Sequence, residues 1–130
     1  MEKLKFLTDP KLYKSALAFV VYLTKTKNEE DLFNQLKSKL NFPYYFGNNW
    51  NALNDLLKDF HWIKEKNIVI VHDTIPALND LSFQIYIQIL LDAAQDWREN
   101  ADHSLEIIFP LQPNNLYNSL LNHKFAWSKD

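Results

Sequence analysis

The stretch NIVIVHD, residues 67–73, indicates the fold class of this chain. Four consecutive β-branched residues stand at its centre, charged residues precede it, and Pro76 follows it. A short run that is apolar at every position is typical of a strand covered on both faces, as in a parallel sheet. We therefore expect a buried strand over residues 67–73.

Two further segments have the same character. Residues 16–24 (ALAFVVYLT) are rich in β-branched and aromatic side chains, and residues 104–110 (SLEIIFP) end in a proline. Both compositions favour strands. The apolar run within residues 16–24 is followed at once by Lys25 and Lys27 and has no small-residue cleavage site, so we interpret it as a strand and not as a signal segment.

Helical patterns fill the intervals between these strands. Residues 28–41 open with Asn28 as a candidate N-cap, then carry acidic residues in the first turn and lysines in the last, an order that suits the helix dipole. Residues 49–60 form a second predicted helix. The segment LSFQIYIQIL alternates like a strand, but its continuation LLDAAQDWREN is strongly helical. The whole segment, residues 79–100, is too long for one strand, so we predict a helix from about residue 80. A short helix is expected over residues 115–121.

The order strand, helix, helix, strand, helix, strand predicts an α/β fold with a small three-stranded parallel sheet covered by helices. The 130 residues are expected to form a single domain. Its core would span about residues 16–110, with a short N-terminal extension before it and a C-terminal extension over residues 111–130.

Composition excludes several classes of function. With 14 basic and 16 acidic residues the net charge is −2, so the basic surface that nucleic-acid binding requires is not expected. The absence of cysteine excludes disulfides and thiolate metal sites, and it fits a cytoplasmic protein. No apolar run approaches the roughly 18 residues of a membrane span. We also find no metal-ligand or cofactor-binding motif, and therefore expect no metal, cofactor or membrane partner.

Residues 42–57 read FPYYFGNNWNALNDLL and contain Gly47, the only glycine of the chain. Gly47 would take a positive φ angle or allow close approach of another backbone segment. Asn48 or Asn49 can cap the following helix. Of the aromatic residues 44–46, one is expected to anchor the loop in the core while the others face outward.

The helix predicted after Gly47 has two faces. The apolar face is expected to pack on the sheet, and its members are Trp50, Leu53, Leu56, Leu57 and Phe60. The second face is expected to point into solvent, and its members are Asn51, Asn54, Asp55 and Lys58. From the residues alone, this is either an ordinary capped amphipathic helix beside a satellite aromatic cluster, or a surface for binding a protein.

Residues 43–57 resemble the signature segment of the barstar family, whose members are small intracellular inhibitors of secreted bacterial ribonucleases. The shared pattern is a proline, an aromatic pair, Gly47, an asparagine, and then Ala-Leu followed one residue later by an aspartate. The order of predicted elements also resembles that fold. Two positions differ from the pattern: Asn51 replaces a carboxylate usual in the family, and Asn54 stands where the namesake has an aromatic residue.

The resemblance implies roles for the matching residues. Tyr45 would contact the nuclease, Asp55 would enter its active site in place of a substrate phosphate, and Asn51 and Asn54 would flank Asp55. The full expected partner-binding set is Tyr45, Gly47, Asn48, Asn51, Asn54, Asp55, Asp59 and Phe60.

The resemblance further implies that the chain is not an enzyme. It would be a cytoplasmic inhibitor, an antitoxin or immunity protein, that occludes the active site of a cognate bacterial ribonuclease or related nuclease toxin. The free chain would be monomeric. One alternative is a binding module on the same scaffold with a non-nuclease partner. Another is a small enzyme that uses the pair His72 and Asp73 at a strand end, although the sequence supplies no nucleophile beside it.

Overall fold

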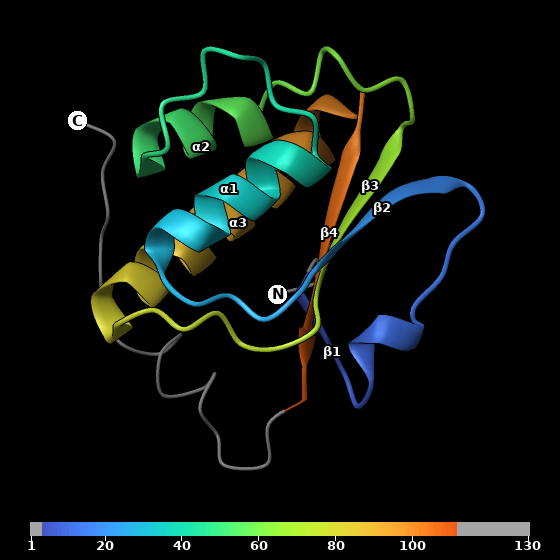
Figure 1. Cartoon of the computed structure of the whole chain (residues 1–130). Helices are drawn as coiled ribbons and strands as arrows, with labels where there is room; N and C mark the ends of the chain where they lie inside the picture. The colour runs from blue at the N-terminus through green and yellow to red at the C-terminus, as the bar shows by residue number, and fades with distance from the viewer. Residues whose placement is uncertain (1–3, 112–130) are drawn as a thin grey trace.

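Four parallel strands and three α-helices make up residues 4–111, the part of the chain that this computed structural model describes (Figure 1). In chain order the elements are β1 (Leu4–Leu7), the 3-10 turn η1 (Pro10–Leu12), β2 (Ala18–Leu23), α1 (Glu29–Lys39), α2 (Trp50–Leu57), β3 (Asn67–His72), α3 (Asp80–Asn100) and β4 (Ser104–Pro110). The predicted α/β class and parallel sheet are confirmed. The helix expected over residues 115–121 lies outside the described residues.

The sheet has the order β1-β4-β3-β2, so the expectation of three strands is wrong. The additional strand, β1, pairs in parallel with β4, with Leu4 opposite Ile107. It buries Leu4, and Lys5 forms a salt bridge of 2.9 Å with Glu106 of β4. Four residues are too few to show a strand period in the sequence. Pairing with β4, which is distant in sequence, therefore makes this segment a strand.

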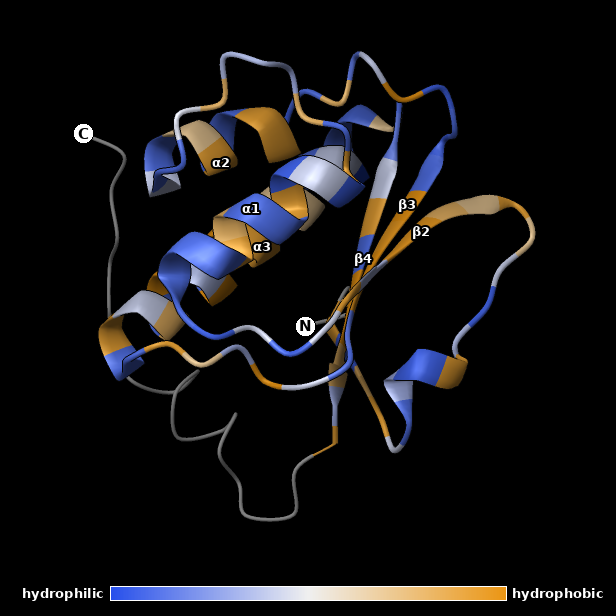
Figure 2. Ribbon diagram, in the orientation of Figure 1, coloured by the Kyte–Doolittle hydropathy of each residue, from blue (hydrophilic) through white to orange (hydrophobic). Residues whose placement is uncertain are grey.

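The two faces of the sheet are covered differently. All three α-helices lie on one face (Figure 1). Alternate residues of β3, Ile68 and Ile70, belong to the core on that side, whereas Val69 and Val71 belong to a smaller cluster on the other side with Tyr13. Both sets of side chains give β3 its continuously apolar sequence, seen as orange in Figure 2. The α-helices thus cover only one face of the sheet, and η1 packs against β3 and β4 on the other face.

The N-cap predicted for α1 is confirmed, and α3 begins with a cap of the same kind that was not predicted. The Oδ1 of Asn28 accepts a hydrogen bond of 2.8 Å from the backbone N–H of Asp31 at the start of α1. Asn79 caps α3 in the same way through the N–H of Ser82. The alternating segment near the start of α3 is helical because its buried residues recur every three or four positions; these are Phe83, Tyr86, Ile87, Ile89, Leu90, Ala93, Ala94 and Trp97.

Helix α2 packs mainly against α3, which corrects the expectation that its apolar face lies on the sheet. The indole Nε1 of Trp97 on α3 donates a hydrogen bond of 2.8 Å to the carbonyl of Leu57. The ring of Phe60, just beyond α2, stacks on the Trp97 ring with centroids 5.7 Å apart. These contacts fix the end of α2 on α3.

Candidate partner-binding site

Gly47 provides room for the residue that caps α2. The Oδ1 of Asn49 accepts a hydrogen bond of 2.8 Å from the N–H of Ala52, and its Nδ2 donates one of 3.2 Å to the carbonyl of Gly47. A Cβ atom at position 47 would lie 3.1 Å from this Nδ2, tighter than ordinary contact. Gly47 does not have a positive φ, contrary to one of the expectations. Its missing side chain instead permits the cap.

Asn48 adopts the left-handed conformation that was considered for Gly47. Its φ is 49°, in a region that asparagine tolerates better than most residues. Its Nδ2 donates a hydrogen bond of 3.0 Å to the Oδ1 of Asn34 on α1. The bend before α2 is therefore tied to a neighbouring helix by a half-buried side chain.

The three loop aromatics divide as predicted into one anchor and two exposed rings. Phe46 is buried and contacts Phe33 and Phe42 in edge-to-face arrangements. Tyr44 and Tyr45 are 93% and 60% exposed, and their ring centroids lie 5.7 Å apart. Two large aromatic side chains are thus held at the surface by a loop whose base is fixed in the core.

The polar face of α2 is only partly in solvent. Asn51 and Asp55 are exposed, and Lys58 is half-buried. Asn54 is only 7% exposed, which corrects the expectation that it points into solvent. The buried residues of α2 form a wide stripe made up of Leu53, Asn54, Leu56 and Leu57. The Oδ1 of Asn54 is buried and has no hydrogen-bond partner.

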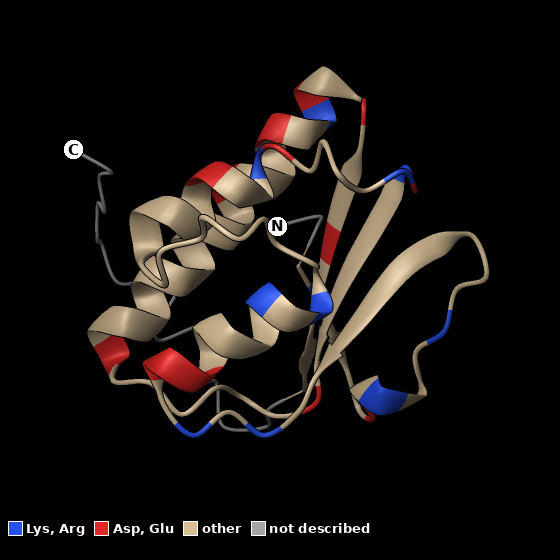
Figure 3. Cartoon of the chain, turned by 45° about the horizontal axis from the view of Figure 1, so that its top comes forward, with Lys and Arg blue, Asp and Glu red and all other residues tan. Residues whose placement is uncertain are grey.

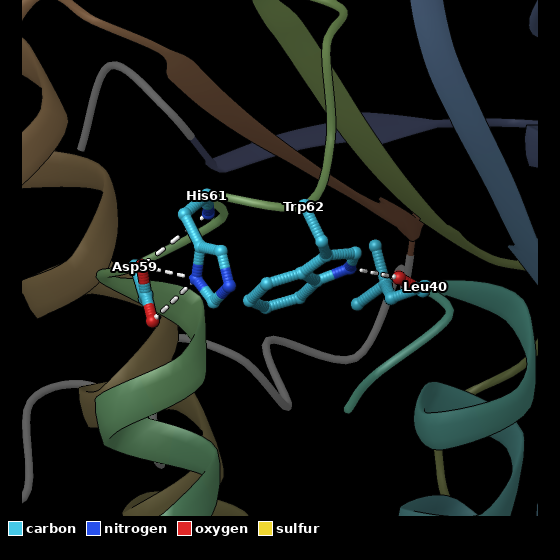
Figure 4. A network of polar contacts seen from close by, with 4 residues as sticks. All are labelled: Leu40, Asp59, His61 and Trp62. Carbon is cyan, nitrogen blue, oxygen red and sulfur yellow. Dashed lines mark hydrogen bonds and ion pairs between the residues drawn. The ribbon is translucent and has the colours of Figure 1, made fainter. Parts of the chain in front are cut away.

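The segment after α2, residues 59–62, carries acidic and aromatic side chains close to α2 (Figure 4). Asp59 is exposed, and both of its carboxylate oxygens lie 3.0 Å from the Nδ1 of His61. The indole Nε1 of Trp62 donates a hydrogen bond of 2.8 Å to the carbonyl of Leu40, which anchors this segment beside the end of α1. His61 was not among the expected site residues, although its spacing from Asp59 could have indicated it.

Phe60 does not belong to this surface. Its side chain is 0% exposed and it takes a φ of 49°, which turns the chain away from the helical path. The structure therefore corrects the expectation that Phe60 is available to a partner. Of the expected residues, those exposed in the structure are Tyr45, Gly47, Asn51, Asp55 and Asp59.

Few charged side chains lie on α2 and the residues that directly follow it. Figure 3 shows acidic and basic residues at several separate places on the molecule. Asp55 and Asp59 supply the exposed carboxylates of the α2 region, with half-buried Lys58 between them in sequence. Within residues 4–111 there is no group of three or more histidines, aspartates or glutamates placed to hold a metal ion. None of the helices described has the length and apolar character needed to cross a membrane.

His72, one of the two residues considered for catalysis, is part of the buried core. His72 is fully buried, and its Nδ1 lies 2.9 Å from the carbonyl of Ile108 while its Nε2 lies 2.6 Å from the hydroxyl of Tyr86. A carbonyl can only accept, so Nδ1 carries the proton and the Tyr86 hydroxyl donates to Nε2. Burial lowers the pKa of His72 to about 4, against the smaller opposite effect of the Ile108 carbonyl. Burial also raises the pKa of Tyr86. Both ring nitrogens of His72 are occupied within the core and cannot reach a substrate.

Comparison with known proteins agrees with the signature around Gly47. The family described as "Barstar (barnase inhibitor)" matches residues 16–109. Neither the search of curated proteins nor the search of solved structures gave a match. The matched region begins just before β2 and ends within β4, so it includes all three helices but not β1. This chain belongs to the barstar family.

Proposed function

We propose that this protein inhibits a cognate bacterial ribonuclease, or a related nuclease toxin, by covering the active site of that enzyme with α2 and the loop before it. Membership of the barstar family supports a ribonuclease as the class of partner. The observation that carries the proposal is the exposed carboxylate of Asp55 on a helix that is capped by Asn49 and held against α3.

In this proposal Asp55 acts as an anion in the place of a substrate phosphate. A nuclease active site must present cationic and N–H groups to a phosphate, and those groups also bind a carboxylate. Tyr45 supplies an exposed aromatic contact beside α2, and Asn51 and Asp59 contact the rim of the active site. Gly47 and Asn48 act indirectly, because they fix the bend from which α2 starts. The protein would act in the bacterial cytoplasm as an immunity protein or antitoxin.

The test uses three baits in a pull-down from secreted and cytosolic fractions of the source organism: wild type, Asp55→Ala and Lys58→Ala. Asp55 lies on α2 and Lys58 directly follows the last residue of that helix, so Lys58→Ala controls for removing a nearby charged side chain. We expect wild type and Lys58→Ala to retain a nuclease whose RNA or DNA cleavage they inhibit, and Asp55→Ala to lose it. Retention of the same nuclease by all three baits, or of none by wild type, would refute the proposal.

A second candidate function is a binding module on the same scaffold with a non-nuclease partner. It is favoured by the small net charge of −2 and by the uncharged Asn51, which together give little electrostatic attraction for a basic enzyme. Capture of a protein without nuclease activity that depends on Asp55 would favour this candidate over the first.

A further inference from the structure

Strand β2 forms one edge of the described sheet, next to β3. The backbone groups of successive residues in a strand point alternately to its two sides. The carbonyl of Leu23 accepts a hydrogen bond from the segment that follows β3, whereas the carbonyl of Tyr22 accepts one from Lys39 of α1 on the free side. By this alternation, the N–H and C=O groups of Ala18 and Val20 also point to the free side.

Helix α1 protects only the C-terminal half of this edge. In addition to the bond to Tyr22, the side chain of Gln35 accepts a hydrogen bond of 2.9 Å from the N–H of Thr24. In the part of the chain that the structure describes, no hydrogen bond reaches the outward backbone groups of Ala18 and Val20. Such an open strand edge is a template on which another extended chain can pair.

A shallow groove of about 570 Å³ lies along the open half of the edge. Its lining includes Phe19 and Val20 of β2, both half-buried, and residues 14–16 of the preceding loop. Leu17, between these two parts of the lining, is 85% exposed. Because side chains alternate along a strand, this groove suits an extended chain with an apolar side chain at every second position.

Charge determines which extended chain fits this edge. Strand β2 carries no charged residue (Figure 3), and Lys14 is the charged residue that lines the groove. Residues 10–28, which include β2 and both of its flanks, contain no acidic residue and four exposed lysines: Lys11, Lys14, Lys25 and Lys27. A second β2 edge would bring these lysines together, and residues 112–130 carry two lysines against one aspartate. Like charge disfavours both of these occupants, whereas an acidic segment is attracted.

We propose that the open half of the β2 edge binds a short extended segment of a partner protein, in which acidic and apolar residues alternate, as an additional strand. Main-chain hydrogen bonds to Ala18 and Val20 hold the segment, and its apolar side chains contact the groove. Its carboxylates pair with Lys14 and the other flanking lysines. This surface includes neither Asp55 nor the loop before α2, so the inference does not depend on the function proposed above.

Amide hydrogen exchange, measured by NMR on the full chain, tests the proposal residue by residue. In the free protein the N–H groups of Phe19 and Val21 should exchange slowly because they face β3, and those of Ala18 and Val20 should exchange fast. The probe is a synthetic peptide of alternating glutamate and valine, and the control peptide alternates lysine and valine. The acidic peptide should slow exchange at Val20 and should bind about 10-fold or more tightly than the basic one.

Two variants separate the backbone contribution from the charge. Val20→Pro removes the outward N–H but no bond to β3, and proline is tolerated at such edge positions. It should abolish binding of the acidic peptide, whereas Val20→Thr should retain it. Lys14→Glu should raise the Kd of this peptide about 5-fold or more. Lys58→Glu and Asp55→Ala, both at α2, should leave it within about twofold.

The inference is overturned if neither peptide binds, if both bind equally, or if Val20→Pro or Lys14→Glu has no effect. It is also overturned if the N–H groups of Ala18 and Val20 are already protected in the free chain. Protection that grows with protein concentration would assign the edge to a second copy, and protection independent of concentration would assign it to residues 112–130. Loss of the peptide from Asp55→Ala would place its binding at α2 and would equally refute the proposal.

Discussion

His72 makes the free energy of unfolding depend on pH in the acidic range. In the folded protein it is neutral, fully buried, and stacked on Phe109 with ring centroids 4.0 Å apart. Its pKa is lowered from 6.5 to about 4 because burial penalises the charged form. In the unfolded chain the same imidazole is hydrated and takes up a proton at its ordinary pKa.

The sign of the effect follows from proton binding. Between pH 6.5 and about 4 the unfolded chain binds a proton at His72 that the folded protein does not, so acid favours unfolding. The contribution of neutral His72 is fully present above pH 6.5 and is lost as the pH falls toward 4. Linkage over this interval gives a loss of about 2 kcal/mol at pH 5 and about 3 kcal/mol at pH 4. These values are large beside the roughly 5–15 kcal/mol that stabilises a typical domain.

The assay is chemical denaturation of wild type and His72→Asn at several pH values between 8 and 4. The asparagine side chain can still donate a hydrogen bond toward the Ile108 carbonyl, but it does not titrate. We expect the variant to be less stable at pH 8 and the difference between the two proteins to shrink by about 3 kcal/mol on acidification to pH 4. A difference that stays constant over this range would refute the assignment of His72 as a buried neutral imidazole.

Three further predictions concern the backbone. Asn49→Ala removes the α2 cap and should lower the free energy of unfolding by about 1 kcal/mol in urea denaturation; an unchanged midpoint would contradict the cap. Gly47→Ala should also destabilise, because its Cβ would crowd the Asn49 amide, and the two losses should not add when combined in a double variant. Ala101→Gly should stabilise by about 0.5–1 kcal/mol in the same assay, since Ala101 ends α3 with a φ of 70°; a loss of stability would refute this.

The sequence was informative where local pattern and packing agree. The strands with continuously apolar centres were predictable because both faces of β3 are covered, by Ile68 and Ile70 toward the helices and by Val69 and Val71 away from them. The N-caps of the helices were predictable because each uses an asparagine within its own segment. Strand β1 was not predictable from the sequence, because it forms by pairing with β4, about 100 residues away.

The candidate site was harder to predict residue by residue. A helical wheel groups Asn54 with exposed Asn51, but it cannot show how far the neighbouring elements reach around α2, and Asn54 is covered. For Phe60, helical spacing alone placed the ring correctly on the apolar face, and the resemblance to the family misplaced it at the binding surface. Gly47 suggested a positive φ, yet that conformation belongs to Asn48. Such details depend on packing between elements, which a single sequence does not display.

The most direct test of the account is the Kd of the captured nuclease for wild type, Asp55→Asn and Lys58→Ala, measured by titration calorimetry. Asp55→Asn keeps the shape of the side chain and removes only its charge. We expect Asp55→Asn to raise Kd by about 30-fold or more, equivalent to about 2 kcal/mol, and Lys58→Ala to change it by no more than about threefold. Equal, small effects of the two substitutions would contradict the claim that Asp55 takes the place of a phosphate.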